Sequence, residues 1–168
     1  MKVPPEPADH ALGRSRGGLS TKIHALTDAG TRPITLILTP GQAGDNPQLL
    51  PLLDLHERQR LPGRRHRFRL LADKAYSHPS TRQKLRHKRI QHTIPEKSDQ
   101  IDRRKAKGSK GGRGPAFDAK TYTNRNTIER GFLRLKQWRA IATRYDKHAL
   151  TYLGGLTLAA TLIHLRTN

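Results

Sequence analysis

The stretch FRLLADKAYSHPSTRQKLRHKRIQHTIP, residues 68–95, places one basic run between two apolar runs and decides the class of fold that the sequence predicts. The first apolar run, Phe68 to Ala72, has the length of a short strand and leads directly to Asp73. Pro79 stands near the start of a basic helix, and RIQHTIP then has the β-branched residues of a second strand. A strand, a helix and a strand within about thirty residues predict a right-handed parallel crossover.

An antiparallel hairpin is predicted upstream of this crossover. The runs LSTKIHALT, Leu19 to Thr27, and PITLILT, Pro33 to Thr39, carry alternating and β-branched residues. They are joined by DAGTR, in which Asp28 and Gly30 suit a tight turn. After the breaker TPGQAGDNP, either Asn46 or Asp45 is expected to cap a helix.

Two basic segments are predicted to lack regular structure. Residues 1–18 contain three prolines and the run GRSRGG, and they predict an unstructured basic arm. Residues 98–118, rich in Lys, Arg and Gly, bury too little apolar surface to order themselves and predict a mobile basic loop. That loop either contacts phosphates or serves as a solvated linker. The folded domain is expected to span residues 19–168.

Composition favours a nucleic-acid partner. The 168 residues suit one domain, and a formal charge of +20 calls for a polyanion, most commonly nucleic acid. The absence of cysteine excludes thiol catalysis and disulfides and suits a reducing cytoplasm. The apolar run from Ala149 to Leu165 contains three Thr, a Gly pair and His164, and it predicts a buried closing helix rather than a membrane span. No membrane partner is expected.

Four side chains of the stretch YTNRNTIERGFLRLK, residues 122–136, share one face of a predicted helix. These side chains are Tyr122, Arg125, Glu129 and Lys136. At about 100° per residue, their directions around the helix axis lie within about 60° of one another. An ordinary i, i+4 ion pair between Arg125 and Glu129 would explain part of this stripe. It does not explain why the stripe borders the apolar face made by Ile128, Phe132 and Leu135, at the rim of a packed surface.

Asp73 has two interpretations. At the end of a strand it can be a turn or N-cap residue, or a functional carboxylate. Together with Glu129 it could hold Mg²⁺, which prefers hard oxygen ligands. Two such ions, about 3.5 to 4 Å apart, activate a nucleophile and stabilise the leaving oxygen in displacement at phosphorus.

The spacing of these four residues resembles the Y-R-E-K signature of the DDE transposases of bacterial insertion sequences. ADKAY around Asp73 is similar to the segment that carries the second acidic residue of that family, and GRSRGGLSTKIH, TPGQAGDNP and KQWRAIATRYDK are also similar to it. The similarity extends from about Pro7 to Leu165. It implies an α/β fold, a ribonuclease-H-like mixed sheet with flanking helices. It also implies DNA strand cleavage and transfer at element ends by three acidic residues with two Mg²⁺ or Mn²⁺ ions.

The resemblance assigns roles by position. Asp73 is implied as the second acid and Glu129 as the third, both as catalytic metal ligands. Tyr122, Arg125 and Lys136 are implied to contact DNA phosphate, and further DNA contacts are expected from the basic residues Lys74, Arg14 and Arg16. The implied partners are insertion-sequence ends and target DNA, bound by a homo-oligomer in a bacterial cytoplasm, in association with the nucleoid.

The first acidic residue of the family has no evident counterpart. Asp9 follows three prolines and cannot stand on a central strand, and Asp28 is placed in the hairpin turn. The first, central strand of the sheet is therefore expected to be missing. The chain alone is expected to be inactive, with two metal ions bound only in the complete enzyme.

Three alternatives stay open. The product of an upstream overlapping reading frame could supply the missing strand, or the chain could be a relic. A non-catalytic basic nucleic-acid-binding protein would explain the charge but not the four-residue stripe. His24 and Trp138 are expected to be packing residues, although Trp138 could stack on a base.

Overall fold

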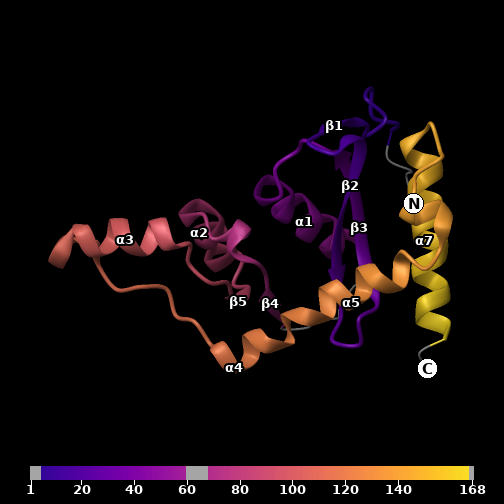
Figure 1. The fold of residues 1–168 in the computed structure, drawn as a ribbon. Helices are drawn as coiled ribbons and strands as arrows, with labels where there is room; N and C mark the ends of the chain where they lie inside the picture. The colour runs from indigo at the N-terminus through magenta and orange to yellow at the C-terminus, as the bar shows by residue number, and fades with distance from the viewer. Residues whose placement is uncertain (1–4, 60–67, 167–168) are drawn as a thin grey trace. The chain divides into compact units, whose positions relative to one another are not determined.

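The computed structural model describes residues 5–59 and 68–166, which divide into two compact units (Figure 1). The hairpin unit comprises residues 5–44, 51–59 and 126–166. The parallel-strand unit comprises residues 45–50 and 68–125. Strands and helices occur in both units, which confirms the predicted α/β class.

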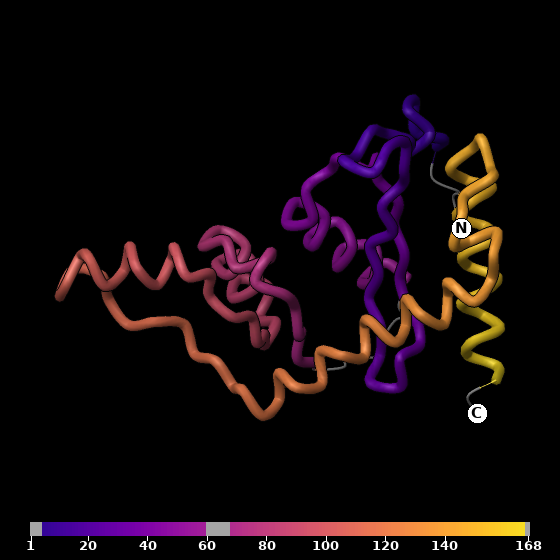
Figure 2. Tube along the Cα trace, in the orientation of Figure 1, coloured from indigo at the N-terminus to yellow at the C-terminus, as the bar shows by residue number. Residues whose placement is uncertain are grey.

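The sheet of the hairpin unit has the order β1-β2-β3 and is antiparallel throughout. β1 is Gly13–Ser15, β2 is Gly18–Thr27 and β3 is Pro33–Pro40. β2 and β3 confirm the predicted hairpin, and they lie side by side up to their turn (Figure 2). In that turn the Asp28 carboxylate accepts hydrogen bonds from Arg32 N at 2.9 Å and Arg32 Nε at 2.6 Å. Asp28 is therefore a turn residue, as expected.

Helices cover both faces of this hairpin. On one face, the Thr35 hydroxyl of β3 contacts His56 and Gln59 of α1, Leu49–Gln59. On the other face, Leu36 and Leu38 pack on α7, Ala149–Leu165, with α5, Asn126–Leu135, and α6, Arg139–Ala142, beside it (Figure 1). The buried core on this side consists of Leu135, Ile141, Tyr152, Leu156, Ala159 and Ile163. Successive side chains of β3 thus point alternately toward α1 and toward α7, as expected for a strand that is covered on both faces.

Glycine permits a close approach of α5 to the hairpin. A Cβ atom at Gly131 would lie 2.8 Å from Thr27 Cγ2 and 3.0 Å from the Thr31 carbonyl oxygen. Thr31 itself has a φ of 66°, in the left-handed region of the turn. The side chain of Arg134, on the next turn of α5, donates to Thr31 Oγ1 at 3.0 Å. These contacts fix the position of α5 on the hairpin.

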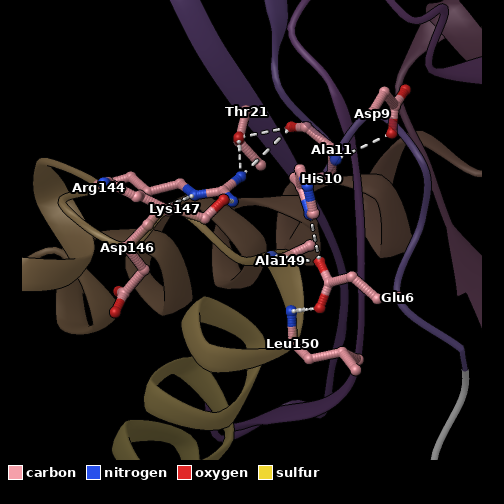
Figure 3. A network of polar contacts seen from close by, with 10 residues as sticks. All are labelled: Glu6, Asp9, His10, Ala11, Thr21, Arg144, Asp146, Lys147, Ala149 and Leu150. Atoms are coloured by element: carbon pink, nitrogen blue, oxygen red, sulfur yellow. Dashed lines mark hydrogen bonds and ion pairs between the residues drawn. The ribbon is translucent and has the colours of Figure 1, made fainter.

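The N-terminal segment is ordered from residue 5 onward, which corrects the prediction of an unstructured arm; residues 1–4 lie outside the described residues. Glu6 caps α7, because its carboxylate accepts from Ala149 N at 2.7 Å and Leu150 N at 3.1 Å (Figure 3). His10 Nδ1 lies 3.0 Å from the same carboxylate. Sequence alone did not reveal this order because the cap and its helix are 143 residues apart.

Arg144 joins the N-terminal segment to the chain around α6. Its guanidinium donates to Thr21 Oγ1 at 2.6 Å and to the carbonyl oxygens of Asp146 and Lys147 (Figure 3). It also lies over the Tyr152 ring, 5.2 Å from the ring centre. Arg144 therefore organises the hairpin unit and is occupied by structural contacts.

In the parallel-strand unit, β4, Arg69–Leu71, pairs in parallel with β5, Gln91–Thr93. α2, Pro79–His87, connects them, so the predicted strand–helix–strand order with parallel pairing is confirmed. Its small core consists of Leu70, Ala72, Leu85, Ile90 and Ile94. Buried Arg82 supports this core, since it donates to the carbonyl oxygens of Ile94 at 2.8 Å and Pro95 at 3.1 Å.

The segment predicted as a mobile loop contains α3, Ser98–Ala106, and the short helix η3, Gly108–Gly111. The helix is held by charge rather than by apolar burial. Asp99 pairs with Arg103 one turn later, and Arg104 Nη2 lies 2.7 Å from Glu96 Oε2. The unit ends with α4, Ala119–Tyr122, and η4, Thr123–Arg125.

The strands form two small sheets rather than the single mixed sheet that the resemblance implies. Within the described residues, no strand pairs with both β3 and β4. The order of strands beyond these two sheets stays a prediction. None of the helices in residues 5–59 and 68–166 combines the length and apolar character needed to cross a bilayer.

Candidate active site

Asp73 stands two residues after β4, at the point where the chain leaves the strand. Its backbone is extended, with φ −68° and ψ 162°, and it occupies the N-cap position of η2, Lys74–Tyr76. Its side chain nevertheless makes no capping hydrogen bond, and 48% of it is exposed. The capping interpretation therefore does not account for this carboxylate.

Arg125 is the cation beside Asp73. Its Nη1 atom lies 3.7 Å from Asp73 Oδ2, and its side chain is 27% exposed. The same guanidinium lies 5.9 Å from the centre of the Tyr122 ring. The structure thus brings together three of the predicted site residues, Asp73, Arg125 and Tyr122, from the end of a strand and from the α4–η4 helical turns.

Asp118 fixes the position of α4 relative to the strand that leads to Asp73. Its carboxylate caps α4 by accepting from Thr121 N at 2.9 Å, and it also accepts from Arg69 Nη1 at 2.8 Å. Arg69 is the first residue of β4. Hydrogen bonds from the Thr121 side chain and backbone, with the Arg69 guanidinium, lower the pKa of Asp118. The carboxylate stays charged and holds α4 to β4.

Glu129 and Lys136 belong to the hairpin unit, where both are exposed. The single helix predicted for residues 122–136 is divided into α4, η4 and α5. A 3-10 turn advances about 120° per residue rather than about 100°. The prediction of one continuous α-helix is therefore wrong, whereas the shared face of the four signature residues stays a prediction. Glu129 lies on α5, and Lys136 directly follows the last residue of that helix.

Tyr76 lies near both Asp73 and Asp45, and sequence reasoning selected neither Tyr76 nor Asp45 for the site. Burial, together with the negative charges of Asp45 and Asp73, raises the pKa of Tyr76 to about 12. Asp45 was predicted only as a possible helix cap, and its side chain makes no cap hydrogen bond with η1, Asn46–Gln48. The sequence signal that could have selected Asp45 for the site is its place in TPGQAGDNP, one of the segments that resemble the transposases.

The remaining predicted residues are divided between the two units. Lys74 is exposed beside Asp73, while Arg14 on β1 and Arg16 in the following turn are exposed in the hairpin unit. His24 is buried, with Nε2 2.7 Å from Thr39 Oγ1, and Trp138 packs against the core of the hairpin unit. Both contacts agree with a packing role.

Neither candidate for the first acid stands on a strand. Asp9 lies in a turn, where its carboxylate accepts from Ala11 N at 2.9 Å. Asp28 is bonded to Arg32, and despite an opposing effect of burial these bonds lower the pKa of Asp28. Both carboxylates stabilise local turns.

A second group of possible metal ligands lies in the hairpin unit. One ligand atom each of Glu6, His10 and His148 lies within 4.8 Å of the others. The rings of His10 and His148 meet edge to face, with centres 5.1 Å apart. Both carboxylate oxygens of Glu6 are already bonded to the start of α7, and Oε1 also to His10. We therefore interpret this group as a helix cap.

Comparison with known proteins places the chain in a family. The sequence profile of the Transposase DDE domain matches residues 1–163. The chain therefore belongs to the DDE transposase family, in agreement with the resemblance of its signature residues.

A relative from Brucella ovis is provisionally named as the transposase for insertion sequence element IS6501. It is 32% identical over 148 residues, which cover 88% of this chain and the whole of the relative. No solved structure matches the chain significantly.

Proposed function

We propose that this chain serves the transposition of an insertion sequence, with Asp73 and Glu129 as two acids of a magnesium-dependent centre for DNA strand cleavage and transfer. The observation that carries the proposal is the pairing at the end of β4, where the Asp73 carboxylate lies 3.7 Å from the Arg125 guanidinium. A metal ligand beside a phosphate-binding cation is the arrangement that in-line displacement at phosphorus requires.

The donor set suits a hard divalent cation. Asp73 offers carboxylate oxygens that are half-exposed and not used for capping, and Glu129 offers an exposed carboxylate on α5. Mg²⁺ or Mn²⁺ prefers such ligands and retains several waters. When bound, the metal would supply activation of the attacking oxygen and charge neutralisation at the phosphate. Two ions are expected only when the complete set of acids is present.

The cations of the signature would hold the DNA. Arg125 can donate two parallel hydrogen bonds to a phosphate. Because its guanidinium lies only 3.7 Å from the Asp73 carboxylate, a phosphate bound in this way would lie beside that carboxylate. Tyr122 supports the guanidinium from its ring face. Lys136, Lys74, Arg14 and Arg16 would add contacts to the phosphate backbone of element ends and target DNA.

The third carboxylate is proposed to come from a further strand. Asp9 and Asp28 are bonded within turns, so neither is assigned to the centre. In the ribonuclease-H-like sheet of order 3-2-1-4-5 that the family resemblance implies, this strand would be the first and central one. We propose that a further segment, covalently joined or encoded in an upstream overlapping frame, supplies this strand, and that the assembly acts as a homo-oligomer on DNA.

A transposition assay tests the assignment. The complete insertion sequence that encodes this chain, carrying a resistance marker, would be compared with Asp73→Asn, Glu129→Gln and the control Asp99→Asn, which changes an exposed carboxylate of α3. Asp73→Asn and Glu129→Gln should reduce transposition at least about 100-fold, because each removes a metal ligand. The control should be unchanged, and immunoblots should show equal protein levels. Normal transposition by Glu129→Gln would end the assignment.

A second candidate, a non-catalytic basic nucleic-acid-binding protein, is favoured by the charge of +20 alone. Both candidates predict DNA affinity that falls steeply with salt and shows little sequence preference. They differ in the carboxylates, since a purely electrostatic binder loses nothing when Asp73 or Glu129 becomes neutral. Unchanged transposition in both variants would favour this second candidate.

A further inference from the structure

A groove with a volume of about 640 Å³ lies in the parallel-strand unit, beside the end of α2 and the strand β5. Its basic wall contains Arg69, Arg82, Arg86 and Arg89. Its other wall is the segment that leads into α4, which includes Phe117 and Asp118. The only acidic residue of the lining, Asp118, is already paired with Arg69. The groove is therefore strongly cationic.

Two of the four arginines are available to a ligand. Arg69 is bonded to Asp118, and Arg82 is buried with its guanidinium on backbone carbonyl oxygens. Arg86 and Arg89 are exposed and form no ion pair within the described part of the chain. Two exposed guanidinium groups three residues apart suit the oxygens of a phosphodiester.

Arg89 occupies a backbone position that glycine normally fills. Its φ is 56°, and the Ile90 N–H donates to the Leu85 carbonyl oxygen at 2.9 Å, which closes the C-terminus of α2. A left-handed residue after a helix is most often Gly, and a side chain there costs about 1 kcal/mol. Folding alone would favour Gly at this position, which an exposed arginine occupies instead.

Phe117 adds an aromatic face to this cationic groove. Its side chain is 46% exposed, and its ring lies 5.1 Å from the Tyr122 ring, centre to centre. An exposed ring beside arginines is the combination on which unpaired bases stack while their phosphates are neutralised. A cavity of this volume has the size of a small-ligand site rather than of a duplex groove.

We propose that this groove binds an unpaired segment of DNA, with a phosphate on Arg86 and Arg89 and a base stacked on Phe117. A row of contacts runs from Phe117 to Tyr122, to Arg125 and to Asp73, all within the same unit. The bound nucleotide would therefore flank the phosphate that is cut. That last step rests on the proposed function; the binding of single-stranded DNA does not.

Fluorescence anisotropy of the purified chain tests the groove, using a labelled single strand of about 12 nucleotides and the matching duplex at fixed salt. The variants are Arg89→Gly, Arg86→Ala and Phe117→Ala. Lys105→Ala is the matched control, because it removes one exposed charge from the same unit outside the groove.

Arg89→Gly should weaken single-strand binding at least about fivefold while the melting temperature stays equal or rises, since Gly suits the left-handed position. Arg86→Ala should weaken it similarly, and this variant tests the phosphate site without any change at the left-handed residue. Phe117→Ala should weaken single-strand binding about fivefold or more and duplex binding less than about twofold. Lys105→Ala should change either affinity less than about twofold.

Losses in Arg89→Gly and Arg86→Ala no larger than that of Lys105→Ala would overturn the phosphate site. An equal loss for single strand and duplex in Phe117→Ala would overturn base stacking. Transposition defects in Asp73→Asn together with the predicted groove losses would support both proposals, whereas normal transposition by Asp73→Asn with the predicted groove losses would overturn only the catalytic assignment.

Discussion

The two units of this chain are held together by different physical means. The hairpin unit has a ten-residue strand, an eight-residue strand and a core of buried, largely apolar side chains from its helices, so apolar burial dominates its stability. The strands of the parallel-strand unit have three residues each, and its elements are joined by Arg82, by the Arg104–Glu96 pair and by the Arg69–Asp118 pair. The unit that carries Asp73 and the groove is therefore the one held mainly by polar contacts.

This difference has a functional consequence. Side chains that bind a phosphate must stay charged and near the surface, so they add little apolar area to the buried core. A unit that devotes its side chains to DNA contacts thus has less apolar surface to bury, and local opening should occur there first. Four changes would break or sharpen this comparison.

The largest effect is expected in the core of the hairpin unit. Leu156→Ala removes a side chain that is 0% exposed, and it should lower the free energy of unfolding by about 2–5 kcal/mol. Leu158→Ala is the control on the same helix, where the side chain is 63% exposed, and it should change stability by less than about 0.5 kcal/mol. Urea denaturation followed by circular dichroism measures both; equal effects would mean that α7 is not packed as described.

The second change concerns polar support in the parallel-strand unit. Arg82→Ala leaves the buried carbonyl oxygens of Ile94 and Pro95 without their donor, at a cost of about 1–3 kcal/mol. Amide hydrogen exchange of β4 and β5 should accelerate accordingly, while that of β2 and β3 stays unchanged. Arg86→Ala, one turn later and exposed, is the control. Unchanged exchange in β4 and β5 would contradict the polar account of this unit.

The third change tests the close contact of α5 with the hairpin. Gly131→Ala adds a methyl group 3.0 Å from the Thr31 carbonyl oxygen and should destabilise the hairpin unit by about 1 kcal/mol. Gly154→Ala on α7 has no atom within 4 Å of the added methyl group. It should stabilise the protein by about 0.5–1 kcal/mol, because Ala favours a helix interior. Thermal melting distinguishes the two, and a stabilising Gly131→Ala would show that α5 can move away.

The fourth change concerns the alkaline response of the parallel-strand unit. The pKa of Tyr76 is raised from 10.0 to about 12, so the folded state favours the protonated phenol. Its contribution is fully present below pH 10 and is lost as the pH rises toward about 12. Tyr76→Phe cannot titrate and should lose less stability over this window. Identical alkaline denaturation curves for the two proteins would exclude this role of Tyr76.

Local patterns predicted most of the regular structure. The β2–β3 hairpin was predictable because strand alternation and the DAGTR turn act over a few residues, and Asp28 does close that turn. The β4–α2–β5 crossover was predictable from Pro79 between two apolar runs. In both cases the deciding contacts lie close together in the sequence.

Contacts between distant residues were not predictable. Glu6 orders the N-terminal segment only because it meets the first turn of α7. α3 is stabilised by ion pairs such as Glu96 with Arg104, which leave no periodic apolar pattern in the sequence. The residues Asp73 and Arg125 were selected from the sequence, but their pairing was not. The 3-10 turn that divides the signature helix has no distinct signal, since it uses the same residues as an α-helix.

The central claim, that Asp73 is a metal ligand beside a phosphate-binding arginine, can be tested directly by NMR. Titration of the purified chain with Mn²⁺ should broaden backbone amide signals most strongly around Asp73 and Arg125, because paramagnetic broadening falls steeply with distance from the bound ion. The same titration of Asp73→Asn should lose this broadening while the spectrum otherwise stays folded. Broadening centred on Glu6, His10 and His148, or broadening unchanged in Asp73→Asn, would contradict the account.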